Sequence, residues 1–302
     1  MLEHINSKIN DGYDFKIVQY IKESFSIVKK YPLPFIGFSM LASLINFLIS
    51  LIPVAGNLIS GFWVAPSLSA GFLVVAHQIS NGKIPQFAQF FDGFKKMRSF
   101  ALVNLTMLIY AFFFIGTAVY LVTELSTKAG IAQELMAIYQ KLTTVDEKPI
   151  KIILILSFFV ILLPIAMLAL FTLTSPFIIF ENMDFWEAMQ NSRKLVARKL
   201  IYYTLIFFLI IGLIIGLTFG IPAYILLPLL NVNEDSSMQQ SGINGILSLT
   251  ELLNFSSFKS IAILLCIGLL PRLVMAFFIP FFYTFIYAIY KDMVTESNTI
   301  EK

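Results

Sequence analysis

Few residues of this chain could bind or transform a small molecule, and Arg272 is the most unusual of them. It stands in the run LLPRLVMAFFIP (269–280), between two prolines and among apolar residues. A charge inside hydrocarbon costs about 2.5–3.5 kcal/mol on insertion scales, so such residues usually face a helix bundle or a wet cavity. Either Arg272 contacts an anion or a lipid phosphate at mid-membrane, or Pro271 breaks the helix and Arg272 reaches the outer headgroups.

The other residues with acid–base chemistry that attract notice are His77, Asp184 and Asp292, at the ends of apolar runs. The sequence contains no phosphate-binding glycine loop, no dinucleotide-binding fingerprint, and no H-E-x-x-H or G-x-S-x-G motif. Two histidines are too few for a metal site built from histidines alone, and a single cysteine, Cys266, cannot form a disulfide within the chain. We therefore expect no enzymatic activity, no cofactor and no metal.

The composition indicates what kind of element must position these residues. The chain has 302 residues, of which 58% are hydrophobic and only 13% charged, and its mean hydropathy is +0.83. Soluble domains carry about 25% charged residues. A soluble protein with half of that share would expose large apolar patches and aggregate. The composition predicts one integral membrane domain over residues 1–302.

Apolar runs long enough to cross a bilayer occur six times in the sequence. A spanning helix needs about 20 mostly apolar residues, and every backbone group in lipid must find its partner inside the helix. The sequence therefore predicts an all-α, polytopic fold. Its predicted spans are 33–54, 57–80, 99–124, 151–180, 200–230 and 260–290.

The positions of the basic residues predict how these spans are oriented. Most of the 21 Lys and Arg residues flank the runs on the side that carries both ends of the chain. Cytoplasmic loops of membrane proteins carry an excess of Lys and Arg. Both termini are therefore expected in the cytoplasm. An even number of spans, such as six, places the two termini on the same side of the membrane.

Three polar segments that precede apolar runs share a pattern when they are aligned on Ser24, Gly93 and Ser192. Apolar residues stand six and three positions before the small residue, an acidic or amide residue stands directly before it, and basic residues follow. The pattern predicts three cytoplasmic amphipathic helices, each followed by a transmembrane hairpin. Such units start on the same side and form parallel repeats; the alternative is convergence on a common local pattern. The predicted units are 12–80, 84–180 and 184–293.

Amphipathic helices of this kind suit the headgroup region of a membrane. They carry aromatic and aliphatic residues on one face, and their basic ends complement both the helix C-terminus and the anionic inner leaflet. The basic clusters flank spans and lack a nucleic-acid reading element, so we expect no nucleic-acid partner. The candidate interfacial anchors are Phe87, Phe90, Trp186, Met189, Lys95, Lys96, Arg193, Lys194, Arg198 and Lys199.

Small and amide residues within the spans predict contacts between helices. Asn46, Asn57 and Asn104 are expected to form hydrogen bonds from one helix to another. Gly212, Gly216 and Gly220 follow each other at intervals of four on the fifth span. This stripe predicts close packing against another helix, within the chain or between chains.

Three stretches of the chain resemble a bacterial multispan family related to the membrane domain that is fused to some glycerophosphoryl diester phosphodiesterases. They are APSLSAGFLVVAHQISNGKIPQFAQFFDGFKK (65–96), PFIIFENMDFWEAMQNSRKLVARK (176–199) and FIPFFYTFIYAIYKDM (278–293). Ala188, Ser192 and Leu195 match one helix pattern of the family, and Tyr290 ends its closing span. The catalytic domain of those enzymes is a separate soluble barrel that this chain lacks, so the resemblance implies a non-catalytic protein of the bacterial cytoplasmic membrane.

These observations lead to two functional hypotheses. In the first, the protein organises membrane lipids or a membrane protein partner without catalysis. In the alternative, it is a small transporter or a lipid-translocating protein in which Arg272 contacts an anion. The alternative predicts a polar cavity near the midplane, lined by Arg272 and by some of Asn46, Asn104 and Thr172.

Overall fold

A computed structural model describes residues 13–128, 164–216, 220 and 270–294. Within these ranges the regular elements are helices, and no strand occurs. The elements are α2 (Ile17–Lys30), α3 (Pro32–Ser50), α4 (Ala55–Ile59), the π-helical η1 (Ser60–Val64), α5 (Ala65–Ser80), the 3-10 helix η2 (Phe87–Lys96), α6 (Met97–Lys128), α9 (Thr174–Phe180), α10 (Phe185–Ala197), α11 (Leu200–Ile215) and α15 (Leu270–Val294).

Several of these helices are long and apolar enough to cross a membrane, as a multi-pass protein requires. Four pass by length and composition: Pro32–Ser50, Ala55–Ser80, Phe87–Phe114 and Met275–Val294. Counting α10 and α11 as one bent span raises the number to five. The all-helical prediction is confirmed for the described residues, while six spans stay a prediction because 151–163 and 221–269 lie outside them.

The first two apolar runs are separate helices joined by a tight turn. Val54 adopts a left-handed backbone conformation with φ 58°, which ends the α3 segment before α4 begins at Ala55. From there α4, η1 and α5 continue one another up to Ser80. Pro66 lies at the start of α5, directly after the π-helical turn η1. Proline has no backbone N–H to donate, so the regular helical hydrogen-bond pattern is interrupted at this point.

Two of the three predicted amide contacts between helices are confirmed. The Ser60 hydroxyl donates to Asn46 Oδ1 at 2.6 Å and so joins η1 to α3. Asn104 Nδ2 on α6 donates to the Gly61 carbonyl of η1 at 3.3 Å. For Asn57, the described part of the chain provides no such hydrogen bond.

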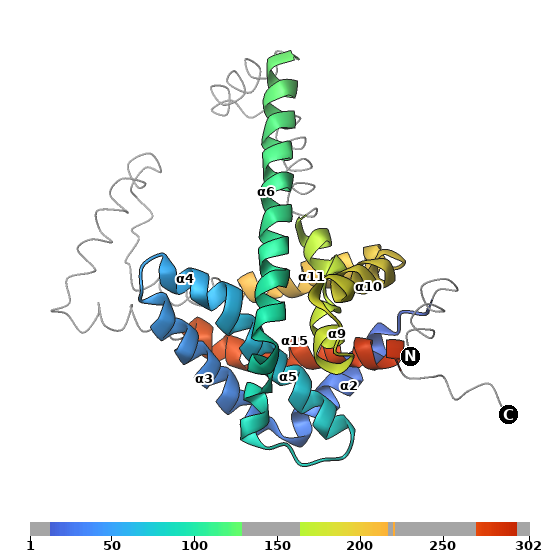
Figure 1. The fold of residues 1–302 in the computed structure, drawn as a ribbon. Coiled ribbons are helices and arrows are strands. Elements are labelled where there is room, and N and C mark those ends of the chain that lie inside the picture. Colours follow the sequence, from blue (N-terminus) through green and yellow to red (C-terminus); the bar gives the residue numbers. More distant parts are fainter. Residues whose placement is uncertain (1–12, 129–163, 217–219, 221–269, 295–302) are drawn as a thin grey trace, which may run out of the picture.

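The core lies where α2, α3, α5, η2, α9 and α15 meet, and we call this region the packed end. Aromatic rings fill much of it. Phe38 of α3 stacks on Phe90 of η2 with ring centroids 4.3 Å apart, and Phe72 of α5 packs edge-on against both. Figure 1 shows these helices gathered around the base of the upright helix α6.

Helix α6 leaves the packed end after its first turns. Its beginning packs on η1 and on α10, and the rest of the helix rises away from the other described elements (Figure 1). There Phe112 and Phe113 are exposed, with 74% of the Phe113 surface accessible. The described residues therefore form one densely packed region and one long apolar projection.

Close helix packing occurs at two glycines that were not predicted. A Cβ placed on Gly212, Gly216 or Gly220 would meet no described atom within 4 Å. Residues 217–219 and 221–269 lie outside the described part of the chain, so the packing of this stripe stays a prediction. A Cβ on Gly71 of α5 would lie 1.8 Å from the Phe90 carbonyl oxygen, and one on Gly93 of η2 would lie 2.0 Å from that of Ser67. The backbones of α5 and η2 approach each other at these two glycines.

Candidate functional site

The last two turns of α15 connect three separate parts of the packed end. Tyr287 pairs with Nδ1 of His77 on α5 at 3.2 Å. The Tyr290 hydroxyl donates to the carboxylate of Glu181, which follows α9. Positions three apart on a helix share a face, which explains why both tyrosines point toward α5 and α9.

The same turns also contact α2 through two ionic groups. Lys291 Nζ lies 2.7 Å from Glu23 Oε1, and the Tyr20 hydroxyl donates to Asp292 Oδ2 at 2.8 Å. Lys16 approaches Asp292 at 3.6 Å. We call the whole set of polar side chains around α15 the α15 polar cluster; it consists of Lys16, Tyr20, Glu23, His77, Glu181, Tyr287, Tyr290, Lys291 and Asp292.

Tyrosines outside the apolar spans remain protonated donors in this region. Burial raises the pKa of Tyr20 far above its usual range, and the hydrogen bond to Asp292 acts in the same direction. Burial also raises the pKa of Tyr13 to about 12. The Tyr13 hydroxyl lies 3.2 Å from the Leu195 carbonyl oxygen, to which it donates, and 3.3 Å from the Tyr203 hydroxyl. The segment before α2 is thereby attached to α10 and α11.

The bonds of the α15 polar cluster join the end of α15 to α2, to α5 and to Glu181, which follows α9. Among the described residues, no group of three or more His, Cys, Asp or Glu side chains is arranged to hold a metal ion. His77 and Asp292, which stood out in the sequence, each pair with a tyrosine of another helix. The arrangement is suited to fixing the end of α15 against α2, α5 and α9.

Ser192 of α10 supplies hydrogen bonds where the helical pattern of the apolar segment 164–180 is interrupted. Residues 171–173 form a turn between two helical stretches. The Leu173 N–H donates to Ser192 Oγ at 3.1 Å, and the Ser192 hydroxyl donates to the Leu170 carbonyl at 2.8 Å. One hydroxyl thus satisfies a donor and an acceptor that the turn leaves without helical partners.

The three small residues on which the polar segments align are all buried. Ser24 lies on α2, which packs on α15, and its hydroxyl donates to the Tyr20 carbonyl at 2.6 Å. Gly93 lies where η2 packs on α5, and Ser192 lies where α10 packs on α9. Each amphipathic helix therefore presents its small residue to an apolar helix.

The four predicted apolar anchors divide into two pairs. Phe90 is fully buried and Met189 is 2% exposed, so both are core residues, and the prediction that they anchor the surface is corrected. Phe87 and Trp186, three residues earlier in each helix, are each 47% exposed. Only this second pair presents a large apolar surface outside the protein.

The six predicted basic anchors lie at the ends of η2 and α10. Lys95 pairs with Asp92 at 2.7 Å, and Lys96 donates to Asn182. Arg193 donates to Gln190 at 2.7 Å, and Lys199 lies 5.9 Å from the centre of the Tyr202 ring. The side chains of Lys194 and Arg198 are exposed at the end of α10.

Arg272 lies in the first turn of α15, and its side chain is outside the part of the chain that the structure describes. Its predicted companions are bonded elsewhere. Asn46 and Asn104 join helices, and the Thr172 hydroxyl donates to the Ala169 carbonyl at 2.7 Å. The anion contact therefore stays a prediction.

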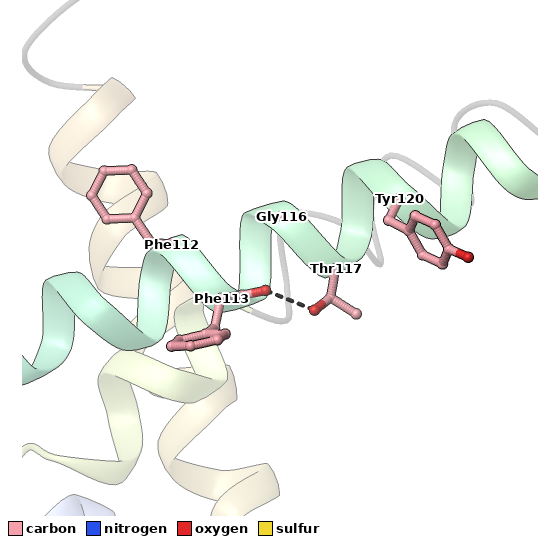
Figure 2. Close-up of a pocket in the computed structure, with 5 residues that line it drawn as sticks. All are labelled: Phe112, Phe113, Gly116, Thr117 and Tyr120. Atoms are coloured by element: carbon pink, nitrogen blue, oxygen red, sulfur yellow. Dashed lines mark hydrogen bonds between the residues drawn. The ribbon is translucent and has the colours of Figure 1, made fainter.

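The outer half of α6 offers an apolar depression of about 410 Å³. Figure 2 shows its lining residues, Phe112, Phe113, Gly116, Thr117 and Tyr120, spread along one helix. The Thr117 hydroxyl donates to the Phe113 carbonyl one turn earlier at 2.7 Å, so it is occupied within α6. The depression offers aromatic surface and no free charge from its lining residues.

Sequence reasoning missed most of the α15 polar cluster. The signal was present as YAIYKD (287–292), four polar residues in the last turns of an otherwise apolar helix. The partners of these residues stand 109 to 276 positions away along the chain, so no local pattern names them. A search of family models, curated proteins and solved structures finds no match for this chain.

Proposed function

We propose that this chain is a non-catalytic integral membrane protein of the bacterial cytoplasmic membrane that organises lipids, or a membrane partner, around three interfacial helices. The observation that carries this proposal is the division of α10 into two faces. Ala188, Ser192 and Leu195 are buried toward the protein, whereas Trp186 and Lys194 are exposed. An exposed aromatic residue with basic residues at the C-terminal end of a helix suits a headgroup layer.

The bend between α10 and α11 supports the same placement. The two helices meet at 99°, and α11 is apolar along its length. A helix that lies along a membrane surface and then enters the bilayer needs a bend of this size. Asp184 caps the start of α10 by accepting from the Trp186 N–H at 3.4 Å, which favours an independent helix.

The proposal includes six spans in three parallel units, with both termini in the cytoplasm. The burial of Ser24, Gly93 and Ser192, each on an amphipathic segment that packs on an apolar helix, supports the repeat. The proposed relationship to the membrane domain of glycerophosphoryl diester phosphodiesterases has similar support. Its pattern residues Ala188, Ser192 and Leu195 all face the protein interior, as packing motifs do.

The membrane depth of Trp186 tests the proposal directly. The chain has two tryptophans, so Trp63→Phe leaves Trp186 as the only indole. The full chain would be reconstituted in vesicles that carry brominated lipids with bromine at different depths. We expect the strongest quenching of Trp186 fluorescence by bromines just below the headgroups, since the helix is proposed to lie in that layer.

The matched control is Trp186→Phe, which leaves Trp63 on the apolar stretch Ala55–Ser80. Its fluorescence should be quenched by bromine placed along the acyl chains. Quenching of Trp186 by aqueous iodide, with no effect from any brominated lipid, would show that α10 does not touch the membrane and would reject the proposal.

A further inference from the structure

An apolar groove of about 220 Å³ runs between α11 and α15, and α2 contributes to its wall. Apolar side chains alone line it. Among them are Ile17 of α2, Leu209 and Leu213 of α11, and Phe278 and Phe285 of α15. Phe207 and Phe282 bridge the two long helices with ring centroids 5.7 Å apart. A groove of this lining, between two apolar helices, is suited to a hydrocarbon chain.

Two lysines lie next to the end of the groove that Ile17 forms. Ile17 also lines a second, shallow depression together with Lys16 and Lys22. The Lys16 side chain is 51% exposed although it approaches Asp292, and Lys22 is exposed and forms no ion pair with the described residues. A negatively charged group at this place would meet at least one uncompensated lysine.

A third lysine and two aromatic rings continue this rim. Phe15, which also lines the depression, stacks on Tyr202 with ring centroids 6.0 Å apart. Lys199 lies over the same Tyr202 ring. Asp14 is the acidic residue of this segment, next to Phe15. The rim thus combines three lysines with aromatic rings, a composition that favours the headgroup layer of an anionic membrane.

We infer that the groove and its rim bind one anionic phospholipid, with an acyl chain between α11 and α15 and the phosphate near Lys16, Lys22 and Lys199. The inference rests on the proposed membrane location and adds a site and a ligand class to it. The apolar lining favours an acyl chain, and the lysines favour a negatively charged headgroup. The acyl chain of a zwitterionic lipid fits the groove equally well, but its headgroup has a weaker electrostatic attraction to the lysines of the rim.

Native mass spectrometry of the full chain tests this site. The protein would be purified in detergent and equilibrated with equal amounts of phosphatidylglycerol and phosphatidylethanolamine. We expect preferential retention of one phosphatidylglycerol. Removing a lysine near a membrane surface costs about fivefold in the affinity for anionic lipid. Lys22→Gln and Lys199→Gln should each reduce phosphatidylglycerol retention by about that factor and leave phosphatidylethanolamine unchanged.

Two further variants separate the groove from general charge. Leu209→Trp fills the groove and should remove the bound lipid of either kind; Leu213→Trp repeats the test should the first variant fail to accumulate. Lys83→Gln removes an exposed charge from the segment between α5 and η2, which lines neither the groove nor its rim, and should leave retention unchanged.

Three results would overturn the inference. They are equal retention of both lipids by the unaltered protein, an equal loss in the Lys83→Gln control, and conversion of a dimer to a monomer by Leu209→Trp without any change in lipid. The last result would assign the groove to a second copy of the chain. The depth of Trp186 is independent of all three, because Trp186 does not line the groove.

Discussion

The packed end and the outer half of α6 are both rich in apolar residues but lie in opposite surroundings. Half of the apolar window of Met275–Val294 is buried inside the protein, whereas Phe112 and Phe113 on α6 are 70% and 74% exposed. Phe90 and Phe113 illustrate the difference, since one is enclosed by other rings and the other is exposed. Both residues are hydrophobic and avoid water. Tertiary contacts decide which of these side chains stabilise the fold and which remain exposed to lipid or to another protein.

The largest expected effect comes from shortening a phenylalanine in each region. Phe90→Ala removes a fully buried ring and should reduce the free energy of unfolding by about 3–5 kcal/mol. Phe113→Ala should change it by less than about 0.5 kcal/mol, because 74% of the Phe113 surface is exposed among the described residues. Unfolding by SDS in mixed micelles measures both values. Similar losses in the two variants would remove the contrast between the regions.

A methyl group added to a glycine should have opposite effects in the two regions. Gly71→Ala forces a Cβ against the backbone carbonyl of Phe90 and should cost about 3 kcal/mol, the upper range for overpacking. Gly116→Ala on α6 meets no described atom within 4 Å and should stabilise the helix by about 0.5–1 kcal/mol. Thermal unfolding midpoints in detergent should therefore move in opposite directions. A Gly71→Ala protein as stable as the original would place α5 and η2 further apart.

Removing a hydroxyl group in each region should change the stability by a smaller amount. Ser192→Ala leaves the Leu170 carbonyl and the Leu173 N–H without their partner and should cost about 2 kcal/mol. Thr117→Ala loses one bond to its own helix at an exposed position and should cost less than about 0.5 kcal/mol. Hydrogen exchange at Leu173 gives a second readout, which should rise only in Ser192→Ala. Unchanged exchange there would show that Ser192 does not secure the turn.

Helix positions followed from the sequence where length and hydropathy were sufficient. The runs predicted at 33–54 and 57–80 correspond to helices Pro32–Ser50 and Ala55–Ser80, because twenty apolar residues have few other stable conformations in lipid. The amide contacts of Asn46 and Asn104 followed from the same reasoning, since a polar side chain among apolar helices needs a partner.

The sequence did not predict which side chains face the protein core and which face outward. Phe90 and Met189 have the residue types of membrane anchors and are core residues, because protein interior and lipid are both apolar. The sequence did not single out Gly71, although α5 and η2 approach each other closely at this glycine. Whether such a residue is buried depends on which helix packs against it. That pairing is determined by contacts between residues far apart in the sequence.

The pairing of α2 with α15 has a consequence for biogenesis. Tyr20 and Asp292 are 272 residues apart, so the ribosome releases α2 long before its partner exists. Until α15 has been made, Tyr20, Ser24 and Ile27 lack the surface that buries them in the folded chain. A nascent or truncated chain that lacks α15 therefore leaves this face of α2 uncovered.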